Sequence, residues 1–372
     1  MKHRTRTITL RGKGGAPLLL GGGNPVLVQT MWKDKLERVD AGVVERVFSL
    51  QKLGAKLLRF AVPDIKAAEV LGELAGAVLL PLVADIHFDY RIALRILDFP
   101  IAKLRLNPGN IGAKERVRQV LEKAGDAGVP IRIGVNAGSL PVDLRKRADA
   151  GEISRARALV EAAERECSFF DDAGFKDFVV SMKASSVPET IEANRLFSER
   201  SDAPLHIGVT EAGPLAAGLV RNTAALWTLL REGIGDTVRV SLSDSAENEV
   251  IAGREILGAV SESAVYEGAP DAENRCKGAL KARIVSCPRC GRCGFDTHAF
   301  TARWQTRLYA LQKEITVAVM GCAVNGPGEA RHADIGITGA GGAALIFKHG
   351  EIARRVKLEE ADAAFEEELN RI

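Results

Sequence analysis

The sequence lacks any long apolar run, and its net charge is small. No stretch of about 18 consecutive apolar residues occurs in the 372 residues, so no membrane-spanning helix is predicted. The first ten residues are polar and basic and lack the apolar core of a secretory signal. A net charge of +3 is too low to indicate binding to nucleic acid or to an anionic membrane, although local basic clusters can still bind a small anion.

Cysteine is scarce but clustered. Of six cysteines, four lie in two short loops, at Cys287, Cys290, Cys293 and Cys322. Proline and glycine bracket both loops, which predicts sharp turns that direct several side chains towards one place. In an intracellular chain such convergence indicates a metal or redox role rather than structural disulfides. The cysteine usage and the missing signal together predict a cytoplasmic protein.

The spacing of these cysteines bears on the kind of metal. A zinc ribbon needs a second Cys-x-x-Cys pair to close a tetrahedral site, whereas only Cys322 follows the first loop here. Glu329 lies seven residues further on. Three thiolates with one weaker ligand suit an iron–sulfur cluster that keeps one iron available for chemistry. Spacing alone favours iron–sulfur over zinc and leaves zinc as an alternative.

The preceding part of the chain alternates apolar runs with amphipathic segments. Eight such alternations predict a (β/α)₈ barrel, with a doubly wound open sheet as the less suitable alternative. The expected strands are 26–30, 56–61, 79–84, 102–106, 131–135, 177–181, 205–209 and 237–242. The clearest helical patterns are 36–53, 65–75, 155–173, 215–230 and 246–260.

Loop-like residues after position 260 predict a domain boundary. We therefore expect a barrel over 1–262, a linker over 263–283 and a smaller α+β unit over 284–372. In that unit the pattern predicts strands 284–286, 316–320, 335–338 and 344–348, with helices 298–313 and 359–370. The glycine-rich residues 339–344 precede a strand rather than a helix, so they are predicted to form a β-turn and not a dinucleotide-binding loop.

The carboxyl ends of the predicted strands carry polar residues. In a barrel these ends share one mouth, where chemistry takes place. A surplus of cations in that mouth would destabilise the protein unless an anion filled it, and arginine forks match phosphate oxygens. We therefore predict a small phosphorylated substrate, a diphosphate. The cations are Arg59, Arg105, Arg132, Lys183 and Arg239, opposed mainly by Asp85 and Glu211.

Several motifs resemble one family, 4-hydroxy-3-methylbut-2-en-1-yl diphosphate synthase of the methylerythritol phosphate pathway. They are residues 81–90, 103–112, 132–140, 205–213, 320–330 and 333–337. The resemblance covers about residues 24–358. It implies reductive ring opening of 2-C-methyl-D-erythritol 2,4-cyclodiphosphate to 4-hydroxy-3-methylbut-2-enyl diphosphate, with two electrons delivered singly by reduced flavodoxin or ferredoxin.

The resemblance also implies site residues. A [4Fe–4S] cluster would be held by Cys287, Cys290, Cys322 and Glu329, and substrate oxygen would displace the weakly bound Glu329. Glu211 is the candidate for proton delivery. The family forms a homodimer in which the cluster unit of one subunit caps the barrel of the other. The substrate-binding residues carried over are Arg59, Asp85, Arg105, Arg132, Asn136, Lys183, His206, Arg239 and Ser241.

Two departures from the family pattern stand out. Residues 32–34 replace small polar residues in the first barrel loop, and Cys293 stands where the family has no cysteine, as a bystander thiol or an alternative ligand. Two other functions remain open: a barrel methyltransferase of the pterin or corrinoid kind with structural zinc, and a zinc-ribbon binding module on an inactive barrel. Both need a fourth soft ligand, for which only Cys293 is available.

Overall fold

The computed structural model describes residues 5–107, 111–277, 281–322 and 324–372. They form two compact units, and the boundary between the units falls between residues 279 and 280. Within the described residues, no helix combines the length and apolar character needed to cross a membrane. Each unit is described by itself below.

The first unit is a parallel barrel, which confirms the predicted fold class. Its eight strands follow the order β8-β7-β6-β5-β4-β3-β10-β9, and a parallel bridge between Val180 and Leu205 links the two ends of that order. All eight predicted strands are present, within a few residues at their ends. They are β3 (Leu27–Met31), β4 (Leu57–Ala61), β5 (Leu82–Ile86), β6 (Lys103–Leu106), β7 (Ile131–Asn136), β8 (Phe178–Lys183), β9 (His206–Ile207) and β10 (Thr237–Val238).

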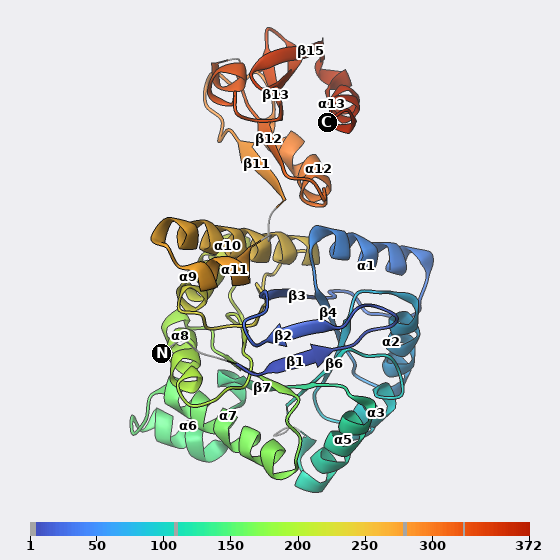
Figure 1. Cartoon of the computed structure of the whole chain (residues 1–372), viewed down its shortest axis with the longest axis vertical. Helices are drawn as coiled ribbons and strands as arrows, with labels where there is room; N and C mark the ends of the chain where they lie inside the picture. The colour runs from blue at the N-terminus through green and yellow to red at the C-terminus, as the bar shows by residue number, and fades with distance from the viewer. Residues whose placement is uncertain (1–4, 108–110, 278–280, 323) are drawn as a thin grey trace. The chain divides into compact units, whose positions relative to one another are not determined.

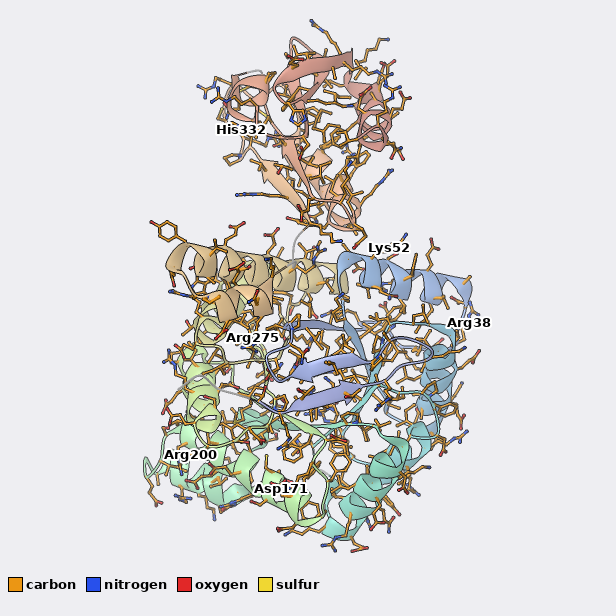
Figure 2. The ribbon with its side chains drawn as sticks, viewed as in Figure 1. Arg38, Lys52, Asp171, Arg200, Arg275 and His332 are labelled. Carbon is orange, nitrogen blue, oxygen red and sulfur yellow. The ribbon has the colours of Figure 1, made fainter. Side chains whose placement is uncertain are left out.

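A ring of helices surrounds these strands (Figure 1). Asp64 and Ser245 illustrate how they begin, since each accepts a hydrogen bond from an N–H group in the first turn that follows. Charged residues on this ring and in its turns, such as Asp171 on α7 and Arg200 just after α8, are exposed (Figure 2). The helices are α1 (Ala41–Leu53), α2 (Ile65–Ala77), α3 (Tyr90–Ile96), α5 (Lys114–Ala127), α6 (Val142–Asp149), α7 (Arg155–Asp172), α8 (Val187–Ser198), α9 (Leu215–Arg231), α10 (Ala246–Glu267) and α11 (Pro270–Cys276).

A β-hairpin that the sequence analysis did not predict closes one end of the barrel. Its strands β1 (Thr7–Leu10) and β2 (Leu18–Gly21) pair antiparallel and lie across the centre of the helix ring in Figure 1. The hairpin side chains pack on the first residues of neighbouring strands, in a cluster of Ile8, Leu10, Leu20, Leu27, Leu57, Val83 and Val179. This apolar plug seals the amino-terminal end, so the carboxyl ends of the strands are left for ligand access.

The predicted linker is wrong over most of its length. Residues 261–263, expected in a loop, lie inside α10, which continues to Glu267. Residues 270–276 form α11, which packs against α10 and carries the buried Cys276. The helical pattern in this stretch is short, and the Gly268 to Pro270 sequence between the two helices was interpreted as a boundary. It is a helix end with Gly268 in the left-handed conformation.

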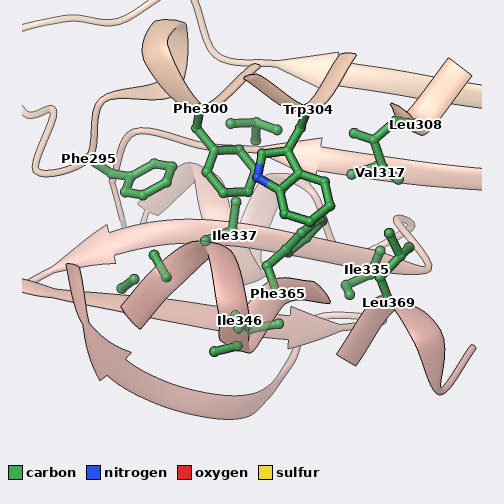
Figure 3. Close-up of a cluster of buried hydrophobic side chains, with 14 of the residues drawn as sticks. Phe295, Phe300, Trp304, Leu308, Val317, Ile335, Ile337, Ile346, Phe365 and Leu369 are labelled. Atoms are coloured by element: carbon green, nitrogen blue, oxygen red, sulfur yellow. The ribbon is translucent and has the colours of Figure 1, made fainter. Parts of the chain in front are cut away.

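The second unit is a five-stranded sheet with two helices on one face. The helices α12 (Thr297–Tyr309) and α13 (Ala361–Asn370) bury Phe300, Trp304 and Phe365 against the sheet (Figure 3). The first three strands are parallel and the last three antiparallel. They are β11 (Ala282–Ser286), β12 (Ile315–Val319), β13 (Ile335–Ala340), β14 (Ala343–Lys348) and β15 (Glu351–Lys357).

Most predictions for this unit are confirmed. The turn expected at residues 339–344 joins β13 to β14, with Gly341 and Gly342 at φ 56° and 74°. Strand β15 was missed because its alternating pattern is largely charged and exposed. Helix α12 ends at Tyr309, four residues before the predicted end at 313.

Candidate active site in the barrel and the cysteine loops

Alternation along the strands directs the predicted cations inwards. In the parallel register Asp85 lies opposite Arg105, and Arg105 lies opposite Arg132. Asp85, Arg105 and Arg132 are all less than 5% exposed, and Arg59 is half-buried. The barrel therefore brings residues of β4 to β7 into one enclosed layer, whereas the sequence analysis expected them at the mouth.

Asp85 is the centre of one charge network. Its carboxylate lies 3.1 Å from Arg105 Nη1 and 3.5 Å from Arg59 Nε. Arg105 Nη1 also lies 2.7 Å from His87 Nε2. Burial opposes ionisation of Asp85, but the positive charge of Arg59 and contacts with His87 and Arg105 outweigh it and hold its pKa well below the ordinary value. One carboxylate is thus shared by two guanidinium groups.

Glu249 is the centre of a second network, which the sequence analysis missed. This carboxylate is 1% exposed and comes from α10. Arg239 donates to both of its oxygens, at 3.2 Å and 3.0 Å, and Lys33 Nζ lies 2.5 Å from Oε1. Thr30 Oγ1 and the Leu242 N–H also donate to it, at 2.8 Å and 3.1 Å. Arg239 is therefore paired with Glu249, and Glu211, the predicted counter-charge, is exposed.

The first barrel loop explains part of this arrangement. Trp32 stacks on Phe60 with ring centroids 5.4 Å apart, and the guanidinium group of Arg46 lies 4.8 Å from the centre of the indole. This packing positions the neighbouring Lys33 to reach Glu249 and the carbonyl of Leu242. The unusual residues at 32–34 thus supply a cation to the site. A lysine in the first loop and a glutamate on α10 were the available signals, but only the fold brings them together.

Lys183 and His206 form a third group in the barrel. Lys183 Nζ lies 3.1 Å from His206 Nε2, and His206 Nδ1 lies 2.6 Å from Thr237 Oγ1. Burial, and then the charge of Lys183, hold the pKa of His206 well below its usual value. His206 is fully buried with both ring nitrogens engaged. It contacts Lys183 directly, and its expected role in substrate binding stays a prediction.

Several buried donors in the barrel are unsatisfied. Among the described residues, no hydrogen-bond partner is present for Lys103 Nζ, for Nε and Nη2 of Arg132, or for either amide atom of Gln29. Burial, and then the charges of Arg59 and Arg105, hold the pKa of Arg132 well below its ordinary value. Burial also lowers the pKa of Arg59 to about 10. Buried donors without partners are costly, so this interior is suited to a polyanion.

Two glycines make room for these cations. A Cβ atom at Gly134 would lie 2.7 Å from Arg105 Nε, and one at Gly208 would lie 3.1 Å from Lys183 Nζ and 2.3 Å from the Arg239 carbonyl oxygen. Any larger residue would displace a guanidinium or ammonium group from the interior.

The remaining predicted residues lie at the strand ends. Asn136 is the last residue of β7 and is half-buried, as is Ser241 after β10. Glu211 follows β9 with its backbone in the left-handed region, at φ 51°, which is uncommon outside glycine and asparagine. Such a conformation recurs at functional sites.

The cysteine loops of the second unit lie side by side. Strands β11 and β12 are parallel and end together, with Ser286 opposite Val319. The Cys287 N–H donates to the Val319 carbonyl at 2.9 Å, and the Gly294 N–H donates to the Gly321 carbonyl at 2.7 Å. The loop after β11, which carries Cys287 and Cys290, is therefore tied to the segment that leads into Cys322, as the sequence predicted.

Cys293 differs from the other three. Its thiol donates to the carbonyl of Phe295 at 2.8 Å, within its own loop. It also lies so close to Gly321 that a Cβ there would be 2.7 Å from the sulfur. The structure thus accounts for this thiol by packing and a local hydrogen bond.

The three thiols of Cys287, Cys290 and Cys322 are of the kind that ligates an iron–sulfur cluster, and hydrogen bonds tie the two loops that carry them together. None of the six cysteines is in a disulfide. Within the described ranges, no three His, Cys, Asp or Glu side chains gather closely enough to hold a metal ion. The side chain of Glu329 lies outside the described residues, so the fourth predicted ligand is not tested.

We expect the barrel to lose stability as pH falls. Asp85 and Glu249 both have lowered pKa values in the folded state, Glu249 mainly because the charges of Arg239 and Lys33 outweigh its burial. Such groups contribute stability that is fully present above their unfolded pKa of about 4 and is lost as pH falls through the folded value.

The variant E249Q should isolate one of these contributions. At pH 7 it leaves Arg239 and Lys33 without their counter-charge, and we expect the free energy of unfolding to fall by about 3–5 kcal/mol in a urea titration. The deficit should shrink at pH 4. E69Q, which removes an exposed partner of Arg95, is the matched control and should change little. Wild-type stability of E249Q at pH 7 would contradict the network.

Comparison with known proteins agrees with both units. Residues 15–254 match the model of the GcpE TIM-barrel domain, and residues 283–371 match that of the GcpE protein C-terminal domain. A protein of Treponema denticola is 50% identical, with 98% of this chain and 97% of that protein covered. One of Treponema pallidum is 50% identical (99% and 92% covered), and one of Thermodesulfovibrio yellowstonii is 43% identical (100% and 99%).

All three relatives are named 4-hydroxy-3-methylbut-2-en-1-yl diphosphate synthase (flavodoxin). The family expected from the motifs is thereby confirmed over nearly the whole chain. With its cation-lined barrel and its cysteine-bearing second unit, this chain belongs to the GcpE family of 4-hydroxy-3-methylbut-2-en-1-yl diphosphate synthases.

Proposed function

We propose that this chain reductively opens 2-C-methyl-D-erythritol 2,4-cyclodiphosphate and removes a hydroxyl group, giving (E)-4-hydroxy-3-methylbut-2-en-1-yl diphosphate. The observation that carries the proposal is the charge balance inside the barrel. Six basic side chains lie in an interior where the described residues supply two carboxylates, Asp85 and Glu249, and Glu249 is also paired with Lys33. They are Arg59, Lys103, Arg105, Arg132, Lys183 and Arg239. A compact diphosphate supplies the missing negative charge.

The barrel residues bind and orient the diphosphate. Two nitrogens of Arg132, Nε and Nη2, have no hydrogen-bond partner among the described residues and can donate to the ligand. The ion pairs with Asp85 hold the guanidinium groups of Arg105 and Arg59 in the interior. As the ring opens, one phosphate oxygen gains charge, and preorganised cations stabilise that charge without rearrangement. Lys183, Arg239, Asn136 and Ser241 complete the proposed binding set, with His206 holding Lys183 in position.

The departing hydroxyl group needs a proton to leave as water. Glu211 is the proposed source, since it follows β9 at the carboxyl ends of the strands and is accessible from solvent. Its left-handed backbone turns the chain sharply at this point. A surface carboxyl can reload from water after each turnover, which a buried group cannot do as readily.

We propose that Cys287, Cys290, Cys322 and Glu329 hold a [4Fe–4S] cluster. When bound, the cluster supplies single electrons and a Lewis-acidic iron. The names of the relatives support flavodoxin as the electron donor, with ferredoxin as the alternative. Because the chain carries the barrel site and the cysteine loops on separate units, we also propose that it acts as a homodimer in which each cluster unit serves a partner barrel.

The zinc alternatives receive no support from the cysteine loops. A structural zinc site needs a fourth soft ligand, and Cys293 is the only one that the sequence offers. Its thiol is engaged with the Phe295 carbonyl within its own loop.

Replacing Arg132 tests the diphosphate site. R132M keeps the length of the side chain but removes the unpartnered donors, so kcat/KM for the cyclic diphosphate should fall about 10- to 100-fold in an anaerobic assay with reduced flavodoxin. R200M removes an exposed arginine (Figure 2) and is the matched control. Equal kcat/KM for R132M and wild type would remove Arg132 from the site.

Single cysteine variants test the cluster ligands. C287S, C290S and C322S should each lower the bound iron well below about four atoms per chain, because each removes a ligand. C293S should retain iron, since its thiol is satisfied locally. Iron, sulfide and zinc are measured on anaerobically purified protein, with circular dichroism to check folding. Loss of iron in C293S, or one zinc in wild type, would overturn the assignment.

A further inference from the structure

Lys103 is a buried lysine at the start of the motif 103–112, and the proposed binding set gives it no role of its own. It is the first residue of β6 and is fully buried. Lys103 and Arg105 are two residues apart on one strand, so both side chains point into the barrel and Lys103 lies nearer the amino-terminal end. Among the residues that the structure describes, its ammonium nitrogen has no hydrogen-bond partner.

The hairpin β1–β2 covers the amino-terminal side of Lys103. Val83, its register partner on β5, belongs to the apolar cluster that the hairpin β1–β2 seals. A lysine at this depth interacts with water only through the mouth where the strands end. An unpaired ammonium group in such a position is strongly destabilised relative to the neutral amine.

The groups around Lys103 further disfavour its charged form. Both interior carboxylates are already shared: Asp85 pairs with Arg59 and Arg105, and Glu249 pairs with Arg239 and Lys33. Burial, and then the charges of Arg132 and Arg59, hold the pKa of Lys103 well below its ordinary value. The charged or titratable groups facing the same interior are Arg59, Asp85, Arg105, Arg132, Lys183, His206, Arg239 and Glu249.

An anion in this interior would favour the charged form of Lys103. A negative charge close to a buried amine favours the ammonium form, because the attraction opposes the cost of burial. Arg132 and Gln29 have buried N–H groups in the same interior that lack a hydrogen-bond partner among the described residues. These groups can donate to the same ligand. Burying an unpaired lysine costs stability in the free protein, and this cost is explained if the lysine gains its partner on binding.

We propose that Lys103 is a further residue of the anion-binding site and that it takes up one proton from solvent as the diphosphate substrate enters the barrel. The inference rests on the proposed function, since it takes the cyclic diphosphate as the ligand. The balance is simple: the neutral amine and a solvent proton become an ammonium group, which pairs with a phosphate oxygen. No electron is transferred in this step.

Titration calorimetry of the oxidised holoenzyme tests the proposal. Without a reductant the cyclic diphosphate binds without turning over, and the heat measured in buffers of different ionisation enthalpy gives the number of protons taken up. At a pH near 8, wild type should take up about one proton more than K103M, and K103M should bind about 10- to 100-fold more weakly. K66M, which removes an exposed lysine on α2, should match wild type.

Two further measurements guard against a folding defect. Ligand-free K103M should melt at or above the wild-type temperature, because an apolar side chain replaces an unpartnered amine. The affinity of wild type itself should fall as pH rises above neutrality, by up to tenfold per pH unit for one coupled proton.

Equal proton uptake in K103M and wild type, or an equal affinity, would overturn the assignment of Lys103. So would a wild-type affinity that is independent of pH. If the cyclic diphosphate does not bind to wild type at all, the proposed function fails, and this inference fails with it.

Discussion

The cost of holding several cations inside a closed barrel is the constraint on which this structure depends. Buried positive charges require counter-charges, and the described part of the barrel interior provides two carboxylates, Asp85 and Glu249, for a larger number of basic side chains. Asp85 and Glu249 are each shared between two cations, which keeps the side chains ordered without neutralising the interior. The protein therefore carries stored electrostatic repulsion that only an anionic ligand relieves, so affinity for a diphosphate and reduced stability of the free barrel have the same origin.

Other features of the barrel serve this interior. The apolar hairpin prevents water from entering at the amino-terminal end, which keeps the surroundings of Lys103 and His206 dry and strengthens every charge interaction there. Gly134 and Gly208 leave space that Arg105 and Lys183 occupy. Lys33 and Glu249 are far apart in the sequence, and their ion pair joins the first barrel loop to α10. In the second unit, the parallel pair β11–β12 does the equivalent work of placing two cysteine loops together.

Much of this arrangement was predictable from sequence because strand periodicity fixes which residues face inwards. The eight strands, the inward cations and the adjoining cysteine loops follow from that rule and from turn residues. Glu249 was missed because nothing local distinguishes it from other glutamates on an amphipathic helix; its role depends on Lys33, more than 200 residues earlier. The linker was wrong because helix α10 continues past a serine-rich stretch that resembles a loop.

The central claim joins the cation-lined barrel to the cysteine loops through one substrate, and electron paramagnetic resonance tests it most directly. The anaerobically reduced protein should show the signal of a reduced [4Fe–4S] cluster, and that signal should change when the cyclic diphosphate is added, because a ligand held by the barrel cations must reach the iron for ring opening. A cluster signal that is identical with and without the cyclic diphosphate would contradict the account.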